Sequence, residues 1–461
     1  MPLPHPPLEE AVEPESILPV TFTRVAAEDL HRELVGMGVP GCDALNGVTL
    51  HSLSLKMLMR NHVLEATGRT ARPLNDFEVK ALVCDLMQAH GGKRAVGRLR
   101  KAYEAAWARL QHHQPGYVQS PEDAAFTADL RAWMTFHEAM LIGEVIPQLY
   151  EYLRSNPVAP ERSEFQHILV DEFQDLNRAE QGVIELLSNQ AHVCIVGDDD
   201  QSIYSFKHAH PEGIREWVVA NPAADDLHLD ECRRCPTTVV HMANSLIAHN
   251  QLRLVPRQLT PRAANGPGDV RIIQFNRLAD EVSGIVEIVR QMIDNGVPPG
   301  DILILAQRGV IGTPIYETLH GYNVPVRSYY AEAELDAEDA QRRFALLKLF
   351  VDRDDRVALR WLVGYPGHNF NAAGYRRLRE HCEQNGLSPW QALEQLSAGA
   401  ITIPHTGNLV AAFEEIVGEL NLLEALPDLA SVIDHLLPVG DDSVRDLRDL
   451  ATRVLAEVGG R

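Results

Sequence analysis

Two adjacent acidic residues close a short apolar segment of the chain. The stretch QHILVDEFQDLNRAEQ (residues 166–181) ends an apolar run on Asp171 and Glu172, and Asp175 follows one turn later. Acids at the carboxyl end of a central parallel strand lie where open α/β sheets bind ligands. There Asp171 could hold a Mg²⁺ ion, and Glu172 could orient and deprotonate a water that attacks a γ-phosphate. The alternative is a solvated strand end, since acids are common there.

A second apolar strand ends in a polar loop. In CIVGDDDQSIYSFKHA (residues 194–209), a glycine and three acids precede Gln201, which is placed to sense a phosphate. Tyr204 and Phe206 follow, with Lys207 adjacent. Aromatic rings beside a cation suit base stacking and backbone attraction on a single strand. The alternative is a pair of core aromatics in a turn.

Two arginines, Arg233 and Arg234, precede a predicted helix in LDECRRCPTTVVHMANSLI (residues 229–247). An arginine at such a position can bind a phosphate through two parallel hydrogen bonds. Cys232 and Cys235 flank the arginines with the C-x-x-C spacing of zinc or redox sites. A structural zinc site needs a second ligand pair, and no C-x-x-C or H-x-x-x-H lies nearby, so zinc is disfavoured.

In this order and spacing, the three stretches resemble the Walker B, third and fourth motifs of UvrD/Rep/PcrA-type superfamily 1 DNA helicases. Upstream, VTFTRVAAEDL (residues 20–30) resembles motif Ia and GVTLHSLSLKML (residues 47–58) resembles motif Ib. DILILAQR (residues 301–308) is similar to a strand of the family's second core domain. The resemblance covers roughly residues 17–364, and the helical remainder resembles the insertion in that domain.

The resemblance implies a role for each matching residue. Asp171 would hold Mg²⁺, and Glu172 would activate the attacking water. Gln201 would couple the γ-phosphate to the DNA groove, and Arg234 would bind the γ-phosphate from the second core domain. The implied single-strand path comprises Phe22, Thr23, His51, Ser52, Tyr204, Phe206 and Lys207. The family commonly has tryptophan and arginine at the last two positions, so this chain keeps the chemistry but weakens stacking and bidentate contact.

Apolar periodicity and the resemblance together predict an α/β protein with two RecA-like parallel-sheet core domains, both incomplete, and helical insertion subdomains. Strands are expected at 270–275, 301–307 and 324–329, and one candidate helix at 125–153. The predicted divisions are a disordered leader (1–16), the first core domain (17–58 and 158–224) with its helical insertion (59–157), and the second core domain (225–334) with its helical insertion (335–461).

The family's phosphate cradle, a Gly-rich loop with Gly-Lys-Thr/Ser, has no match in the sequence. The nearest stretch, Gly-Gly-Lys-Arg at 91–94, lacks the hydroxyl and falls in a helical region. Motifs V and VI, with the arginine finger, are also unmatched. We therefore expect a truncated or split portion of an ATP-dependent, 3′-to-5′ DNA helicase that hydrolyses ATP negligibly alone. The alternative is a non-catalytic, degenerate module that binds DNA or a partner protein.

Composition limits the partners. A net charge of −22 over 461 residues argues against bulk polyanion binding, so DNA contacts must come from local patches or grooves. The basic stretch KRAVGRLRK (residues 93–101) is either a duplex-phosphate contact or a solvated helix face. Scattered cysteines, no long apolar run and no signal peptide predict a cytoplasmic protein without a membrane partner. The expected cofactors are ATP and Mg²⁺. The expected partners are single-stranded DNA, duplex–single-strand junctions and a second chain with the unmatched motifs.

Overall fold

The computed structural model describes residues 12–38, 41–250, 258–327, 335 and 337–458. It divides into two compact units, Met1–Asp225 with Phe344–Pro427 and Asp226–Arg343 with Asp428–Arg461. Most of the predicted leader lies outside the described residues, and Pro14–Ser16 form a short 3-10 helix. None of the helices in these ranges is long and apolar enough to cross a membrane.

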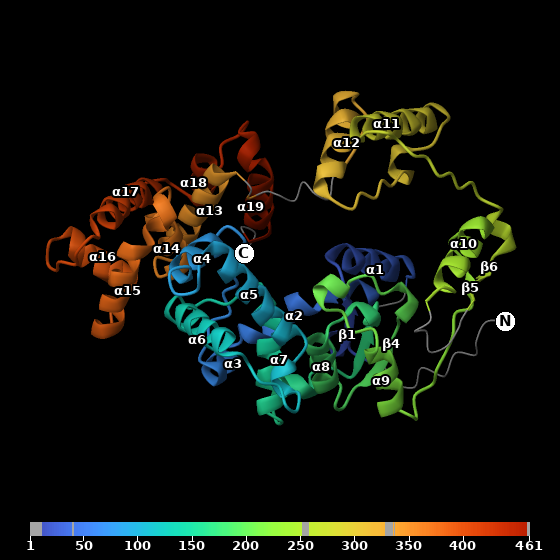
Figure 1. Ribbon diagram of the computed structural model, residues 1–461, viewed down its shortest axis with the longest axis horizontal. Coiled ribbons are helices and arrows are strands. Elements are labelled where there is room, and N and C mark those ends of the chain that lie inside the picture. The colour runs from blue at the N-terminus through green and yellow to red at the C-terminus, as the bar shows by residue number, and fades with distance from the viewer. Residues whose placement is uncertain (1–11, 39–40, 251–257, 328–334, 336, 459–461) are drawn as a thin grey trace. The chain divides into compact units, whose positions relative to one another are not determined.

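The first unit contains a four-stranded parallel sheet in the order β2-β1-β3-β4. Figure 1 labels β1 and β4 of this sheet. Its strands are β1 (Ile17–Thr21), β2 (Val48–Thr49), β3 (His167–Val170) and β4 (His192–Ile195). Val20 pairs with Val48 on one side and with Val170 on the other, and Val170 pairs with Ile195. The parallel sheet predicted for residues 17–58 and 158–224 is therefore formed, and its parallel pairing requires the helical crossovers that connect the strands.

Helices pack on this sheet and complete its core. They are α1 (Arg24–Gly36), α2 (Leu50–Leu58), α8 (Arg178–Leu187) and α9 (Gly213–Ala220). Leu18 and Ile168 belong to a buried cluster with apolar residues of α2 and α8, such as Met57 and Val183. Thr23 begins α1 by accepting a hydrogen bond from the Ala26 N–H, and Asn177 caps α8 in the same way from Glu180. Sequence-local caps thus fix where each helix leaves the carboxyl edge of the sheet.

The insertion at 59–157 is helical, as predicted. It comprises α3 (Asn61–Thr67), α4 (Val79–Leu86), α5 (Lys93–Ala108), α6 (Pro121–Phe136) and α7 (Val145–Ser155). The prediction of one helix at 125–153 is wrong, because the chain breaks between α6 and α7. Glu138 adopts a positive φ of 52°, which ends α6, and Met140 forms an isolated bridge to Pro73. This tertiary pairing overrides a helical pattern that is continuous in sequence.

Residues 344–427 add α14 (Arg356–Gly364), α15 (Ala372–Asn385), α16 (Pro389–Ser397) and α17 (Gly407–Glu424) to the first unit, together with most of α13 (Glu338–Val351). These helices share a core with the insertion, since Val357 packs in the cluster that contains Leu99 and Trp133. Phe77 also meets Trp361 edge to face, with ring centroids 5.3 Å apart. The two helical segments are therefore one packed body.

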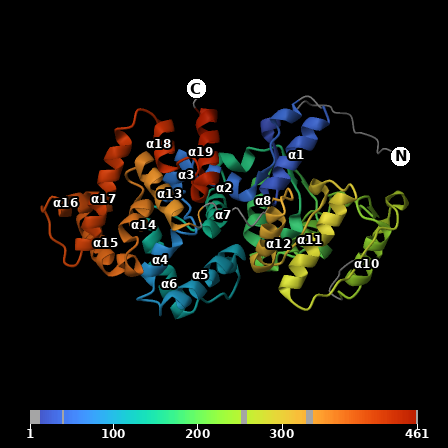
Figure 2. The same cartoon turned by 90° about the horizontal axis from the view of Figure 1, so that it is seen from above.

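The second unit contains β5 (Glu231–Cys232), β6 (Thr260–Pro261), α10 (Thr237–Ile247), α11 (Leu278–Asp294), α12 (Gly309–Gly321), α18 (Leu429–Leu436) and α19 (Arg445–Val458). Helices α11 and α12 lie side by side in both views (Figures 1 and 2). Their shared apolar core consists of Val282, Val286, Val289, Ile315 and Leu319.

The strands predicted at 270–275, 301–307 and 324–329 are not formed in the described part of this unit, and 328–329 lie outside it. Ile302 and Ile304 pack on the core of α11 and α12, whereas Leu303 and Leu305 are 72% and 86% exposed. The alternating burial of a strand is present at residues 302–305, but no regular strand forms there in the described part of the chain. Pairing needs a neighbouring strand edge, which local sequence does not supply. Apart from the short β5–β6 pair, the described residues form no second parallel sheet.

Candidate functional site

The two adjacent acids lie at the carboxyl edge of the sheet, as predicted. The Asp171 N–H donates to the Val20 carbonyl (3.0 Å), which continues the β1–β3 pairing by one residue. Glu172 then turns the chain with a positive φ of 53°, and its N–H donates to Asp171 Oδ1 (3.0 Å). Partial burial and the neighbouring Glu172 raise the pKa of Asp171. Both side chains are exposed, so a ligand can reach them.

Gln174 connects this turn to the next loop, and our reading of the sequence missed it. It is 1% exposed, and its Nε2 donates to Glu172 Oε2 (2.7 Å). Its Oε1 accepts from the Asp198 N–H (3.0 Å). Gly197 makes room for this contact, because a Cβ there would lie 2.6 Å from Gln174 Oε1. The signal in sequence was a glutamine two residues after the acid pair, but only the fold shows what it reaches.

Gln201 is held within its own loop. Its Nε2 donates to Asp198 Oδ2 (2.8 Å), and Asp198 Oδ1 accepts from the Asp200 N–H (3.1 Å). Asp199 accepts a hydrogen bond from Arg215 Nη2 (3.0 Å). The acids before Gln201 therefore shape the loop, and Glu172 is linked to it through Gln174 and Asp198.

The structure brings four of the predicted strand-binding residues into one cluster. The rings of Phe22 and Tyr204 have centroids 5.0 Å apart, and those of Tyr204 and Phe206 are 5.7 Å apart. Lys207 Nζ lies 4.9 Å from the Phe22 ring centroid and 5.2 Å from that of Tyr204. The alternative of core aromatics does not hold for Phe206, which is 72% exposed. Aromatic faces with an adjacent ammonium group suit a nucleic-acid strand.

The other three predicted strand-binding residues lie at helix starts. Thr23 caps α1, and Ser52 donates through Oγ to the Thr49 carbonyl (3.0 Å) in the first turn of α2. His51 Nδ1 lies 4.0 Å from Glu180 Oε1, and partial burial followed by the charge of Lys207 lowers the pKa of His51. Burial raises the pKa of Glu180 to about 7. The carboxyl group of Glu180, with its raised pKa, therefore lies next to His51, one of the predicted strand-binding residues.

Arg234 belongs to the second unit. It is exposed on the turn between β5 and α10, next to the exposed Arg233. Asn265 holds this turn by donating from Nδ2 to the Arg233 carbonyl (2.9 Å) and to the Cys235 carbonyl (3.1 Å). The guanidinium group is thus presented to solvent by a fixed backbone turn.

Asp171 fits a Mg²⁺ ion, which in nucleotide sites takes one or two carboxylates, water and phosphate oxygens. One of its oxygens accepts from Glu172, and the other has no hydrogen-bond donor among the described residues. No group of three or more His, Cys, Asp or Glu side chains in that part of the chain could hold a metal on its own. The residues present do not fit a phosphate cradle. The Gly92-Lys93 pair is the only Gly-Lys in the sequence, Arg94 and not Thr or Ser follows it, and Lys93 begins α5 in the helical insertion.

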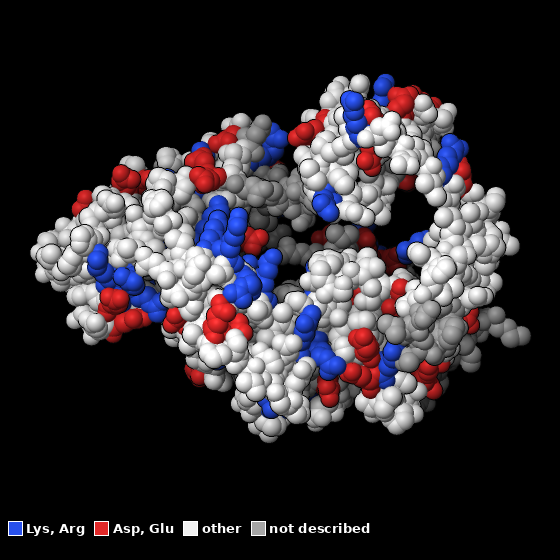
Figure 3. Space-filling model, in the orientation of Figure 1, with Lys and Arg blue, Asp and Glu red and all other residues white. Residues whose placement is uncertain are grey.

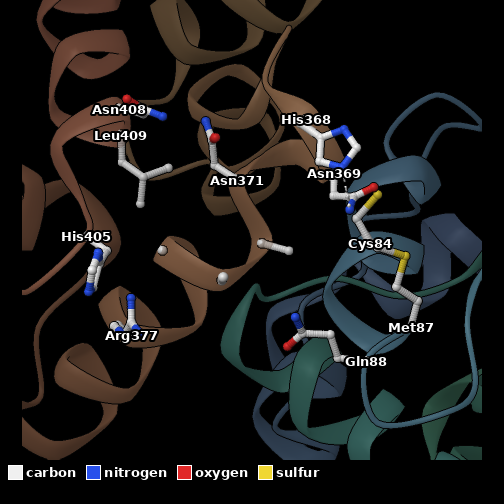
Figure 4. A pocket seen from close by; sticks show the side chains of 13 residues that line it. Cys84, Met87, Gln88, His368, Asn369, Asn371, Arg377, His405, Asn408 and Leu409 are labelled. Carbon is white, nitrogen blue, oxygen red and sulfur yellow. Dashed lines mark hydrogen bonds between the residues drawn. The ribbon is translucent and has the colours of Figure 1, made fainter.

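Two further features lie away from these residues. Figure 3 shows mixed charge with a group of basic side chains over the α4–α5 region, where Lys93, Arg94 and Lys101 are exposed and Arg98 pairs with Glu122 (2.8 Å). Figure 4 shows a pocket lined by residues of α4, α15 and α17, such as Cys84, Arg377 and Leu409, and its volume is about 390 Å³. The described residues that line this pocket include none of the site residues predicted from the sequence.

Comparison with known proteins gives consistent matches. Residues 7–218 match the family described as UvrD/REP helicase N-terminal domain. The chain is 22% identical to ATP-dependent DNA helicase PcrA of Staphylococcus epidermidis, over 96% of this chain and 61% of that protein. It is 25% identical to DNA helicase II of Haemophilus influenzae (93% and 60%) and 26% identical to DNA helicase II of Escherichia coli (89% and 58%). The chain thus spans about 60% of the length of these relatives.

Proposed function

Because these matches place the chain among the UvrD/Rep/PcrA-type helicases, we propose that it acts in an ATP-dependent DNA helicase that moves 3′ to 5′ along single-stranded DNA. The chain would supply the residues that activate water and stack the strand. The observation that carries this proposal is the connection from Glu172 through Gln174 to the Asp198 loop. That loop continues directly into Tyr204, so one covalent and hydrogen-bonded path joins the acid pair to the aromatic cluster.

On the nucleotide side, Asp171 would hold Mg²⁺, which neutralises phosphate charge when bound. Glu172 would then orient the attacking water and accept its proton. Gln201 lies one hydrogen bond from Asp198 and would report the state of the γ-phosphate to the loop. Arg234, exposed on its turn, would provide the bidentate contact to the triphosphate.

On the DNA side, successive bases would stack on Phe22, Tyr204 and Phe206, and Lys207 would attract the phosphates. Lys207 already lies over two of these rings, so an entering base would displace its ammonium group towards a phosphate. The exposed Lys93, Arg94 and Lys101 of α5 would contact the duplex at a junction, where phosphate contacts give salt-dependent affinity.

The printed sequence contains no Gly-Lys-Thr/Ser, which bears on ATP turnover and on the partners of the chain. The chain alone would turn over ATP negligibly, because a cradle normally supplies most phosphate contacts. A second chain carrying that loop would complete the site. The competing function is a non-catalytic module that binds DNA or a partner protein without hydrolysing ATP.

ATP turnover by the purified chain, with and without single-stranded DNA, tests the proposal beside a Glu172→Gln control. We expect background turnover together with strand binding measured by fluorescence anisotropy. Turnover that disappears in Glu172→Gln would show that the chain hydrolyses ATP without a partner. Absence of strand binding would overturn the proposed contacts of the chain with single-stranded DNA.

Co-purification tests whether a second chain binds this one. A tagged chain purified from its source cells should retain a partner whose sequence carries a Gly-Lys-Thr/Ser loop, and the complex should hydrolyse ATP. A complex without such a loop, or without turnover, would favour the non-catalytic module.

A further inference from the structure

Cys232 and Cys235 flank Arg233 and Arg234 at one turn of the second unit. Cys232 ends β5, and Cys235 lies just before Pro236, the N-cap of α10. Both thiols are free and partly exposed. The two cysteines therefore enclose the arginine to which the proposed function gives a phosphate contact, and that function makes no use of them.

The backbone of this turn is held in place by the segment around Gly266. The Thr237 N–H donates to the Gly266 carbonyl (3.0 Å), and the Thr238 N–H donates to the Pro267 carbonyl (3.0 Å). Asn265 binds the carbonyls of Arg233 and Cys235. These contacts engage the carbonyls of the turn and the first N–H groups of α10, and they fix the backbone that carries both cysteines.

The two thiols are chemically different. Hydrogen bonds from the Cys235 and Arg234 backbone N–H groups lower the pKa of the Cys232 thiol, and the Cys235 thiol also donates to its sulfur. Burial and the adjacent Cys232 raise the pKa of the Cys235 thiol. Cys232 is thus the better thiolate, and Cys235 lies three positions further along the same turn. This asymmetry is typical of C-x-x-C pairs that exchange disulfides.

We propose that Cys232 and Cys235 form a reversible disulfide by exchange with a low-molecular-weight disulfide. The Cys232 thiolate attacks the small disulfide, forms a mixed disulfide and expels one small thiolate. The Cys235 thiol loses its proton to solvent and attacks the Cys232 sulfur, which expels the second thiolate. The protein loses two electrons and two protons, and the small disulfide becomes two thiols. A small dithiol reverses the reaction.

The surroundings favour a disulfide over a metal site. No group of three or more His, Cys, Asp or Glu side chains in the described residues could hold a metal, so the cysteine pair has no further ligands there. The disulfide would close a short ring around Arg233 and Arg234 and fix their backbone. Only this consequence for the phosphate contact of Arg234 rests on the proposed function, because thiol exchange needs neither ATP nor DNA.

Mass spectrometry after equilibration in mixtures of reduced and oxidised glutathione tests the proposal. Trypsin cuts after Arg233 and after Arg234, so an internal disulfide joins two peptides that each contain a single cysteine. We expect this linked pair, lighter by two hydrogens, to predominate in oxidising mixtures and to disappear with dithiothreitol. Separate peptides that carry only glutathione, or no modification under excess oxidised glutathione, would overturn it.

Cysteine variants separate the role of Cys232, which attacks the small disulfide, from that of Cys235, which attacks the mixed disulfide. Cys235→Ser should trap a mixed disulfide on Cys232, whereas Cys232→Ser should abolish the linked pair and leave Cys235 largely unmodified. In the reduced wild type, iodoacetamide should alkylate Cys232 several-fold faster at pH 7 than the exposed Cys194, which serves as an internal control. Equal rates, or faster reaction of Cys235, would contradict the assigned roles.

Discussion

Arg360 donates two hydrogen bonds to the carboxylate of Asp85, which lies 275 positions earlier in the chain. The Nε–Oδ2 and Nη2–Oδ1 distances are 2.9 and 2.6 Å, and Arg360 is completely buried. Trp133 Nε1 donates to the same carboxylate (2.9 Å), and the Arg360 guanidinium lies 4.1 Å from the Tyr375 ring centroid. A charged pair thus ties the insertion to the helices of residues 344–427 inside one core.

Arg360→Met should lower the free energy of unfolding by about 3–5 kcal/mol, because it leaves the Asp85 carboxylate in the core without its partner. Adding Asp85→Leu should restore part of the loss, since apolar replacement of a whole buried pair is often neutral but here leaves Trp133 Nε1 without its acceptor. Urea unfolding followed by tryptophan fluorescence measures both. Arg98→Ala, which removes the exposed pair with Glu122, should change stability by no more than about 1 kcal/mol. A loss as small as that for Arg360→Met would contradict the role of the pair.

Gln174→Ala should loosen the connection between the acid pair and the Asp198 loop. It removes two hydrogen bonds and leaves a partly buried N–H without its acceptor, at a cost of about 1–3 kcal/mol. Hydrogen exchange at the Asp198 amide should accelerate accordingly. Gln201→Ala, which removes one exposed hydrogen bond from the same loop, is the matched control and should stay within about 0.5 kcal/mol. Unchanged exchange at Asp198 in Gln174→Ala would refute the connection.

Glu180 should make stability fall as pH rises. Its pKa is about 7 in the fold against 4.5 for the free side chain, so the fold favours the neutral acid. Stability is then fully retained below pH 4.5, decreases as pH rises towards 7 and levels off above it. The total loss is about 3 kcal/mol at 1.36 kcal/mol per pH unit.

Glu180→Gln tests this origin, because glutamine keeps the capping box of α8 without ionising. The variant should match the wild type near pH 4 and be the more stable protein at pH 8. Thermal unfolding across this range measures the difference. Glu185→Gln, on the exposed face of the same helix, controls for the loss of charge. A wild-type slope that persists in Glu180→Gln would assign the pH dependence to other groups.

Lys207 and Tyr204 should contribute differently to strand binding. Lys207→Ala should lower the slope of log affinity against log salt by about 0.7, the value for one phosphate contact on a single strand. Tyr204→Ala should weaken binding by about 1–3 kcal/mol with little change of slope, because stacking is uncharged. Anisotropy titrations at several salt concentrations measure both. Tyr322→Ala provides the control, because the Arg290 guanidinium lies 4.8 Å from the Tyr322 ring centroid in a similar cation–ring contact. Equal losses from Tyr204→Ala and Tyr322→Ala would argue against the aromatic cluster as the strand site.

The sequence by itself determined the local parts of the site. An apolar run that ends on Asp171 and Glu172 specified a strand with acids at its carboxyl edge, and the caps of α1 and α8 followed from Thr23 and Asn177. The four-stranded sheet of the first unit could also be predicted from the sequence, because strand and helix alternate there at the spacing of parallel crossovers. These features depend on residues a few positions apart, where periodicity and capping chemistry act.

Only the tertiary structure decided which distant groups meet. It placed Gln174 between Glu172 and Asp198, laid Lys207 over the ring of Phe22, and broke the helical pattern after α6. It also left residues 270–275 and 301–307 without regular strand structure in the described part of the chain. The physical reason is common to all four cases. Strand pairing, ring contacts and buried hydrogen bonds need a partner brought in by the rest of the chain, and local pattern carries no information about that partner.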